Sequence, residues 1–316
     1  MRTRRRPRTT RADGSTSGDD YDAIVIGGGH NGLIAAAYLA RAGRSTLLIE
    51  ARQEVGGTAT SEPFSGVTVN VCNCDHLTFR TTPVVDELDL ASHGLTYHDV
   101  DPAQHLAAWS DGTLWTQYHD IEATLDGLAG VLPGEVEGYR RYLGAALPAA
   151  RMVLEAAAEP PTLTSLTRRA IRHRFAGSSA LLGWSRRSAA DVLRSYFQHD
   201  ALTAGAAVGG PMVWGVSPEF VGSGLGALSM ATRHVGQVGR PVGGSVAMPR
   251  AVLAAFQGAG GELLAAMRAT EIVCEGERVR GVRLEDGTLR TASIVVSACD
   301  PHRTFLHWLT NPPPAA

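Results

Sequence analysis

The feature that most constrains this chain is a glycine-rich turn between two apolar segments near its beginning. Residues 23–26 are apolar and mostly β-branched, as a strand buried on both faces of a parallel sheet should be. The turn GGGHNG, at residues 27–32, leads into a helix of small residues and a second strand at 45–49, which ends at Glu50. This order of strand, turn, helix, strand and acid predicts a dinucleotide-binding unit, although a glycine turn by itself also suits an unrelated α/β fold.

Each of these residues has a physical task in such a unit. Gly27 permits the sharp exit from the strand, Gly29 lets the backbone approach a pyrophosphate, and Gly32 lets the helix lie close to the strand. The N–H groups of the first helical turn then face the two phosphates. Glu50 accepts hydrogen bonds from a ribose 2′-OH and repels a 2′-phosphate, which favours NAD or FAD over NADP. The nearby Arg52 does not reverse this preference.

The residues after Glu50 make the interpretation more specific. In EARQEVGGTATSE, residues 50–62, the acid is followed after a short spacer by Gly56-Gly57. This spacing resembles the FAD-binding motif of glutathione-reductase-like flavoproteins. With YDAIVIGGGHNG and AAAYLARAG, it is most similar to the phytoene-desaturase-related oxidoreductases, which include carotenoid desaturases and ketolases. The predicted FAD-contacting residues are Gly27, Gly28, Gly29, His30, Asn31, Gly32, Glu50, Ala51, Arg52, Gly56, Gly57 and Thr58.

Two later segments extend the resemblance. Residues 239–263 resemble the family's Gly-Gly turn entering a helix, and residues 269–301 read as strands with a hairpin turn at Asp286-Gly287. The resemblance implies that the buried strand at 294–296 rejoins the dinucleotide-binding sheet. Family members normally continue into a closing segment with a second glycine-rich FAD motif, which the ending TNPPPAA does not supply. We therefore expect the C-terminal part of the family fold to be missing, through truncation or because another polypeptide completes it.

The predicted fold class is α/β, a glutathione-reductase-like FAD-binding Rossmann domain with an inserted α+β substrate domain. The FAD-binding domain is expected at residues 21–80 and 239–309, the substrate domain at 81–238, a disordered basic tail at 1–20 and a short tail at 310–316. Within the substrate domain, helical patterns cover residues 134–154, 162–174 and 189–197.

The composition is typical of a soluble globular protein. The 316 residues are 44% hydrophobic and 19% charged, which suffices to bury a core and allows about two domains. The net charge of −2 gives no overall attraction to nucleic acid, and all 29 basic side chains are arginine. Six arginines fall within the first 11 residues with no apolar run after them. A twin-arginine export signal would need such an apolar run, so we predict a cytoplasmic protein. The arginine-rich tail is expected to be disordered, with a tether to nucleic acid or membrane as the minor alternative.

The four cysteines do not suggest a disulfide framework or a metal centre. Cys72, Cys74 and His76 stand close together, but their spacing matches no common zinc pattern and no redox-active Cys-x-x-Cys pair. We expect ordinary packing near the flavin and no metal. Two more lone histidines, His234 and His302, are expected to be structural like His76, and no catalytic residue is assigned.

Residues 160–190 of the predicted substrate domain contain six arginines and no acid, interleaved with large apolar residues. Such a stretch suits a membrane surface from which lipid-soluble substrates are collected, but a solvated basic face over an apolar core is the favoured alternative. Residues 201–216 are uncharged and glycine-rich, yet shorter than the roughly 20 residues of a membrane-spanning helix. We expect them to line a pocket.

The favoured hypothesis is an FAD-dependent oxidoreductase that passes a hydride from an apolar, carotenoid-type substrate to the flavin. Its partners are then a small apolar molecule and, as an alternative, a membrane surface, with no nucleic acid; the oligomeric state is left open. Two other hypotheses remain. One is a non-catalytic protein of the same fold, similar to the Rab GDP-dissociation inhibitors, or an inactive truncated fragment. The other is a dehydrogenase that uses NAD alone.

Overall fold

The computed structural model describes residues 20–72, 75–107, 111–157 and 162–310. The described residues form two compact units: unit 1 lies within 1–73, 88–95 and 243–316, and unit 2 within 74–87 and 96–242. Residues 88–95 therefore pack in unit 1 and residues 75–80 and 239–242 in unit 2, unlike the ranges expected from the sequence. The domain ranges themselves stay a prediction. Cys74 and nearly all of the two expected tails lie outside the described residues.

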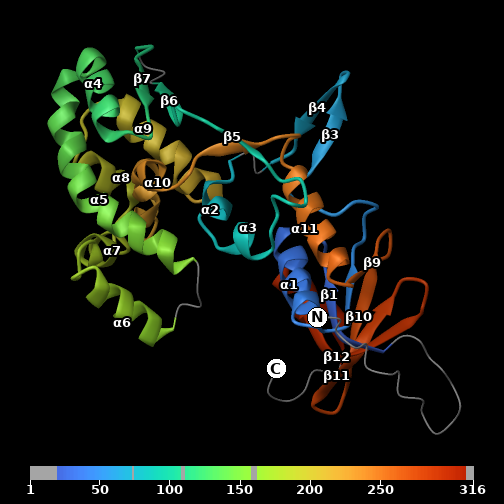
Figure 1. Ribbon diagram of the computed structural model, residues 1–316. Helices are drawn as coiled ribbons and strands as arrows, with labels where there is room; N and C mark the ends of the chain where they lie inside the picture. Colours follow the sequence, from blue (N-terminus) through green and yellow to red (C-terminus); the bar gives the residue numbers. More distant parts are fainter. Residues whose placement is uncertain (1–19, 73–74, 108–110, 158–161, 311–316) are drawn as a thin grey trace, which may run out of the picture. The chain divides into compact units, whose positions relative to one another are not determined.

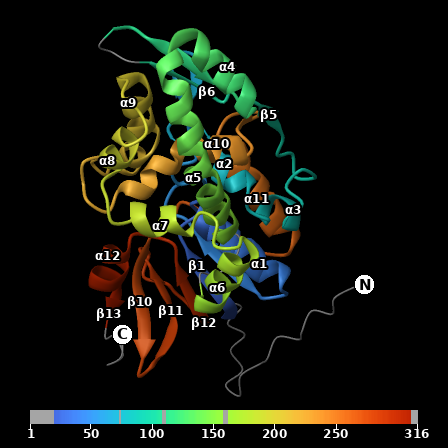
Figure 2. The same ribbon diagram turned by 90° about the vertical axis from the view of Figure 1, so that its left-hand side faces the viewer.

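Unit 1 is built on a seven-stranded sheet in the order β13-β10-β11-β12-β1-β2-β9 (Figure 1). β1 pairs in parallel with both β12 and β2, and β2 pairs in parallel with β9. β10, β11 and β12 form an antiparallel meander, whose strands lie side by side in Figure 2. The elements of unit 1 are β1 (Asp20–Ile26), α1 (His30–Arg41), β2 (Thr46–Ile49), β3 (Ser61–Phe64), β4 (Val67–Asn70), α11 (Ala247–Gly258), β9 (Glu262–Leu264), β10 (Ala269–Glu275), β11 (Arg278–Leu284), β12 (Leu289–Ser297), α12 (Pro301–Arg303), the π-turn η4 (Thr304–Trp308) and β13 (Leu309–Thr310).

The core of this sheet matches its sequence pattern. Ile24 is fully buried and pairs with Leu47 on one side and Val295 on the other. The prediction that residues 294–296 rejoin the dinucleotide-binding sheet is therefore confirmed. The hairpin between β11 and β12 turns at Gly287, which has a φ of +85°, as the Asp-Gly pair predicts.

Helix α1 covers the sheet and packs against α11 (Figure 1). It buries small residues, which allows this close packing: Gly32, Leu33, Ala36, Ala37 and Ala40. Its end is set by Gly43, whose φ is +79°. The N–H groups of Gly43 and Arg44 donate to the carbonyl oxygens of Ala40 and Leu39 at 2.9 and 3.0 Å. This is a Schellman end, for which glycine is the favoured residue.

Unit 2 is mainly helical. Its elements are α2 (Leu77–Arg80), α3 (Val84–Glu87), β5 (Tyr97–Asp99), β6 (Gln104–Ala107), β7 (Leu114–Gln117), α4 (Ile121–Val131), η1 (Pro133–Glu135), α5 (Val136–Ala156), α6 (Leu163–Arg172), α7 (Ser178–Trp184), α8 (Ala189–Arg194), α9 (Asp200–Gly209), η2 (Pro211–Trp214), η3 (Gly224–Leu228), α10 (Ser229–Val235) and β8 (Gly239–Pro241). β5 pairs with β8, and β6 pairs with β7. The three helical patterns expected from the sequence are confirmed as α5, α6 and α8.

The core of unit 2 is aromatic. Trp115, Tyr139, Tyr142 and Phe197 are each at most 2% exposed. The ring centroids of Trp115 and Tyr139 lie 5.7 Å apart in a T-shaped arrangement, a favoured geometry for aromatic pairs. Within the described residues, none of the helices is both long enough and apolar enough to cross a bilayer.

Candidate dinucleotide-binding site

The glycine turn lies at the carboxyl end of β1, where the chain leaves the sheet and enters α1. Gly27 has a φ of +100°, and its N–H donates to the carbonyl of Ile49 at 2.8 Å, which ties the turn to the end of β2. A Cβ at Gly32 would lie 1.9 Å from the carbonyl oxygen of Gly27. Only glycine therefore lets α1 approach the strand this closely, which is the packing role expected for Gly32.

The first turn of α1 offers backbone donors. Its N-cap, Gly29, has no side chain to cap the helix, and the first α1 bond runs from the N–H of Leu33 to the carbonyl of Gly29 at 2.9 Å. The N–H groups of His30, Asn31 and Gly32 precede this bond, so the helical ladder gives them no acceptor. Together with the positive end of the helix dipole, they form an anion-binding terminus.

The side chain of Glu50 is held by two hydrogen bonds at the carboxyl end of β2. Its Oε2 accepts the N–H of Gly28 at 2.7 Å, and its Oε1 accepts the N–H of Arg52 at 2.8 Å. The residue is only 7% exposed. An ionised carboxylate has about four acceptor positions, so each oxygen can still accept a further hydrogen bond. Glu50 therefore fixes the glycine turn and keeps acceptors for a hydroxyl-bearing ligand.

Gly56-Gly57 lies directly against the glycine turn. The N–H of Gly56 donates to the carbonyl of Gly28 at 2.8 Å, and Gly29 and Gly56 form an isolated parallel bridge. A Cβ at Gly57 would lie 2.9 Å from the Cα of Gly29. The two glycine motifs, well separated in the sequence, thus meet backbone to backbone. We call residues 27–32, Glu50 and Gly56-Gly57 the glycine cradle.

The other predicted site residues surround this cradle. Arg52 is half-exposed, and its Nη2 donates to the carbonyl of Gly57 at 2.9 Å, which closes the loop between the two motifs. Ala51, Thr58 and Asn31 are exposed, and His30 is half-buried as the first residue of α1. The structure therefore brings all twelve predicted residues to one edge of the sheet.

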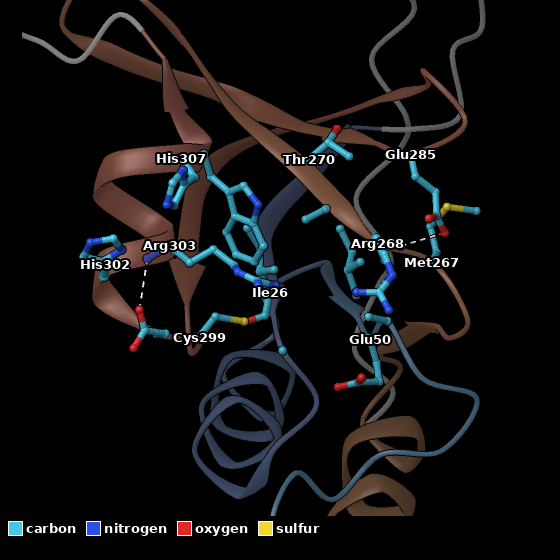
Figure 3. A pocket seen from close by; sticks show the side chains of 16 residues that line it. Ile26, Glu50, Met267, Arg268, Thr270, Glu285, Cys299, His302, Arg303 and His307 are labelled. Carbon is cyan, nitrogen blue, oxygen red and sulfur yellow. Dashed lines mark hydrogen bonds between the residues drawn. The ribbon is translucent and has the colours of Figure 1, made fainter.

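A cavity of about 790 Å³ opens next to the cradle. Figure 3 shows Glu50 and Arg268 on one side of it and Cys299, Arg303 and His307 on the other. Its lining residues are Ile26, Gly27, Ile49, Glu50, Ala51, Met267, Arg268, Ala269, Thr270, Glu285, Cys299, Asp300, His302, Arg303, His307 and Trp308. The cavity thus begins at the carboxyl ends of β1 and β2, where α/β sheets bind ligands.

Most of these lining residues were missed by the sequence reasoning. Cys299 and Asp300 carried a usable signal, because they follow the strand predicted to lie beside β1 and must reach the same edge of the sheet. Met267 carried none. Its N–H donates to the carbonyl of Glu50 at 3.0 Å, and this irregular extension of the sheet has no pattern in the sequence.

Cys299 lies between the cavity and the glycine turn. Its Sγ lies 3.5 Å from the carbonyl oxygen of Ile26 and would be 2.9 Å from a Cβ at Gly27. Burial raises the pKa of the Cys299 thiol, and the charge of Glu50 adds to this rise. The thiol is therefore protonated at neutral pH and acts as a packing group rather than as a thiolate nucleophile.

The lone histidines have distinct surroundings. His76 is 1% exposed, and its Nδ1 lies 2.9 Å from the hydroxyl of Tyr97. His234 is buried in unit 2, whereas His302 is exposed at the cavity beside the cradle. Cys72 is an exposed free thiol. Among the described residues, no three His, Cys, Asp or Glu side chains gather as metal ligands do.

The family model for flavin-containing amine oxidoreductases matches residues 32–313. The chain belongs to the flavin-containing amine oxidoreductase family. Membership indicates FAD as the cofactor and oxidoreduction as the chemistry of the family. The prediction of FAD, made from the spacing of Glu50 and Gly56-Gly57, is confirmed at this level.

Curated relatives support the predicted branch of the family. Phytoene desaturase (lycopene-forming) of Pantoea ananas is 28% identical over 297 residues, which covers 92% of this chain and 58% of the relative. A component of the limonene dehydrogenase of Castellaniella defragrans is 36% identical over 119 residues, covering 38% of this chain and 22% of the relative. The chain spans about half the length of the relatives that it matches from end to end.

Solved structures show the same fold. A putrescine oxidase variant superimposes with a TM-score of 0.64 at 17% identity, covering 93% of this chain and 61% of that one. The predicted fold class is thereby confirmed. A RAB GDI from Plasmodium falciparum reaches a TM-score of 0.52 at 12% identity, covering 91% of this chain and 67% of that one. At these identities the likeness concerns the fold alone.

Proposed function

We propose that this chain binds the adenosine and pyrophosphate end of FAD in its glycine cradle and serves an oxidoreductase whose substrate is an apolar isoprenoid. The observation that carries the first part is the contact between the two glycine motifs. Gly29 and Gly57 face each other where a single Cβ would already lie 2.9 Å from the opposite backbone. Packing at this distance leaves bare backbone at the amino end of α1, and a pyrophosphate needs such a surface.

Glu50 selects the adenosine. The N–H groups of Gly28 and Arg52 fix the direction of its carboxylate. Its remaining acceptor positions suit the hydroxyl groups of a ribose, and its charge repels a 2′-phosphate. The residues present therefore fit FAD or NAD better than NADP, and the family membership favours FAD.

FAD supplies the redox chemistry when it is bound, because its flavin ring accepts a hydride from the substrate. The contribution of this chain is to hold the adenosine end, to orient it and to shield it from water. The described residues assign no catalytic side chain.

An apolar substrate is favoured over an amine by the charges of unit 2. A carboxylate that faces the ligand is one common way to compensate the charge of a buried organic ammonium ion. Among the described residues, Glu135 is the carboxylate buried in unit 2, and its oxygens accept the N–H groups of Gln198 and His199 at 2.9 to 3.3 Å. The named substrates of two relatives, limonene and phytoene, are both isoprenoid hydrocarbons.

One spectroscopic series tests both parts. The purified chain is mixed with FAD and dialysed, and its visible flavin band is recorded. We expect a retained band, which a polyene hydrocarbon in vesicles bleaches without oxygen and an aliphatic diamine does not. Loss of the band on dialysis would refute FAD binding, whereas bleaching by the diamine alone would refute only the substrate class. Capture of a prenylated protein without flavin would favour the non-catalytic alternative.

A further inference from the structure

Helix α6 has its polar residues inward and its apolar residues outward. Its buried residues are Ser165 and Arg169. Leu163 is 85% exposed, Leu166 is 42% exposed and Ile171 is 60% exposed. A surface helix of a globular protein normally has the opposite arrangement. The apolar stripe of α6 therefore lacks the covering that such residues usually receive from a protein core.

The two faces of α6 follow from helical spacing. At about 100° per residue, Leu163, Leu166 and Ile171 fall within one arc of the helix, with Ala170 between them. Ser165 and Arg169, four residues apart, lie on the opposite side. Phe175, which is 63% exposed, follows directly, and its N–H donates to the carbonyl of Ala170 at 2.7 Å. We call Leu163, Leu166, Ile171 and Phe175 the α6 patch.

Polar contacts fix α6 in this orientation. Thr162 caps the helix, since its Oγ1 accepts the N–H of Ser165 at 3.1 Å. At the other end, Nε2 of His173 lies 2.8 Å from Oε2 of Glu155 on α5. Beneath the helix, a hollow of about 370 Å³ is lined by Leu154 and Val235 and by four charged side chains: Arg151, Glu155, Arg169 and Arg172. These charged groups favour the polar face of α6 on the inner side, so the outward direction of the apolar stripe has a physical cause.

The α6 patch is also surrounded by positive charge. Residues 160–190 contain six arginines and no acid. Arg168 and Arg174 are exposed, and Arg168 lines a hollow together with Leu163 and Ile171 of the apolar stripe. Apolar side chains flanked by arginines are what a helix needs to lie in the headgroup region of an anionic bilayer.

A second exposed apolar surface of unit 2 differs in this respect. Val213 and Trp214 are each 70% exposed, and Phe220 is 65% exposed. Its nearby Glu219 is paired with Arg194 at 2.7 Å, so the local charges are balanced. It therefore has the apolar character of the α6 patch without the excess of cations.

We propose that the α6 patch docks on a bilayer surface that contains anionic lipid. Leu163, Leu166 and Ile171 enter the boundary between headgroups and acyl chains, while Arg168 and Arg174 contact lipid phosphates. This arrangement buries the apolar stripe and places cationic side chains against anionic headgroups at the same time. The proposal concerns binding only and does not depend on the flavin chemistry or on the substrate proposed above.

Vesicle co-sedimentation of the full chain, without substrate, tests it. We expect binding to phosphatidylcholine vesicles that contain phosphatidylglycerol, at least about tenfold weaker binding to pure phosphatidylcholine, and weakening by salt. Replacing Leu163, Leu166 and Ile171 together by Gln should weaken binding at least about tenfold. The matched triple replacement of Val213, Trp214 and Phe220 by Gln should leave it unchanged.

The charge contribution has its own pair of variants. Arg168→Gln with Arg174→Gln should weaken binding to the anionic vesicles and not to the neutral ones. The control, Arg141→Gln with Arg240→Gln, removes two exposed arginines of unit 2 away from α6. Equal losses in both pairs would mean that net charge alone matters, which contradicts a docking surface at α6.

Three further results would overturn the proposal. The wild-type chain could fail to sediment with anionic vesicles, the control triple variant could lose binding, or the α6 patch could hold two copies of the chain together. Light scattering detects the last case as a dimer that the α6 triple variant abolishes. If the triple variant does not fold, Leu163→Gln alone, at an 85% exposed site, should still reduce binding several-fold.

Discussion

The glycine cradle of unit 1 is close-packed backbone held by the side chain of Glu50, whereas the centre of unit 2 is made of side chains. In the cradle, Gly29 and Gly57 meet at a distance that excludes any side chain. In unit 2, Nε2 of His234 lies 2.8 Å from the hydroxyl of Tyr139 and 2.9 Å from Nε2 of Gln117. We call these three residues the His234 cluster. It is buried in the aromatic core of unit 2.

This difference determines how each region fails. A cradle built on bare backbone is damaged by adding atoms, even a single methyl group. A buried polar cluster is damaged by removing an atom that completes a hydrogen bond, because the partner left behind loses both water and protein contacts. Opposite kinds of substitution should therefore affect the two regions, and their relative effects can be ranked.

Gly32→Ala should have the largest effect. Alanine is normally favoured over glycine within a helix by about 1 kcal/mol, but here the new Cβ would lie 1.9 Å from the carbonyl oxygen of Gly27. The steric conflict with the backbone should cost more than the helix propensity of alanine gains, and it should destabilise unit 1 by about 3 kcal/mol or more. Urea unfolding followed by circular dichroism measures the change.

The matched control for this substitution is Gly144→Ala in the middle of α5. There a Cβ would meet nothing within 4 Å, and the residue is exposed. We expect this variant to gain about 0.5–1 kcal/mol in its free energy of unfolding. Similar effects at Gly32 and Gly144 would mean that α1 does not need its close approach to β1.

Glu50→Gln should come second. The amide has one acceptor oxygen, so one of the buried N–H groups of Gly28 and Arg52 loses its partner, at about 1–3 kcal/mol. FAD affinity, measured by equilibrium dialysis, should fall as well if Glu50 holds the ribose. Glu54→Gln, in the same loop but exposed and paired with Arg250 at 3.5 Å, is the control and should change neither quantity.

The same contrast explains what the sequence predicts and what it does not. Positions with a left-handed backbone or with no room for a Cβ leave glycine in the sequence, so the turn at 27–32 and Gly56-Gly57 were found in advance. The strand at 294–296 was found because it is continuously apolar and β-branched, although Ile294 proves to be 44% exposed. Hydrogen bonds between side chains that are distant in the sequence produce no comparable pattern of residues. Gln117 and His234 are 117 residues apart, and nothing in the sequence pairs them.

The His234 cluster should make the stability of unit 2 depend on pH. Burial lowers the pKa of His234, against an opposing hydrogen bond to the carbonyl of His119. The unfolded chain therefore binds a proton near pH 6.5, where folded His234 stays neutral. The contribution of His234 to the free energy of unfolding is complete above pH 6.5. As the pH decreases below 6.5, this contribution decreases by at most about 1.4 kcal/mol per pH unit.

Denaturant unfolding at several pH values checks this expectation. His234→Gln should flatten the loss below pH 6.5 relative to the wild type. Tyr139→Phe removes one hydrogen-bond partner but leaves His234 buried, so it should lower stability at every pH and retain the slope. If His234→Gln kept the wild-type slope, the acid sensitivity would have to come from other groups.

Arg52→Ala should have the smallest effect, and it separates two roles for this residue. Arg52 is half-exposed, and its Nη2 donates to the carbonyl of Gly57. Because water can replace this contact, the loss of the side chain should destabilise the chain by only about 0.5 kcal/mol. If its role is to close the loop, ADP and 2′-phosphorylated ADP should both bind slightly more weakly, with their ratio unchanged. If it instead receives a 2′-phosphate, only the phosphorylated ligand should lose affinity. Because Glu50 repels a 2′-phosphate from the same end of β2, we expect the unchanged ratio.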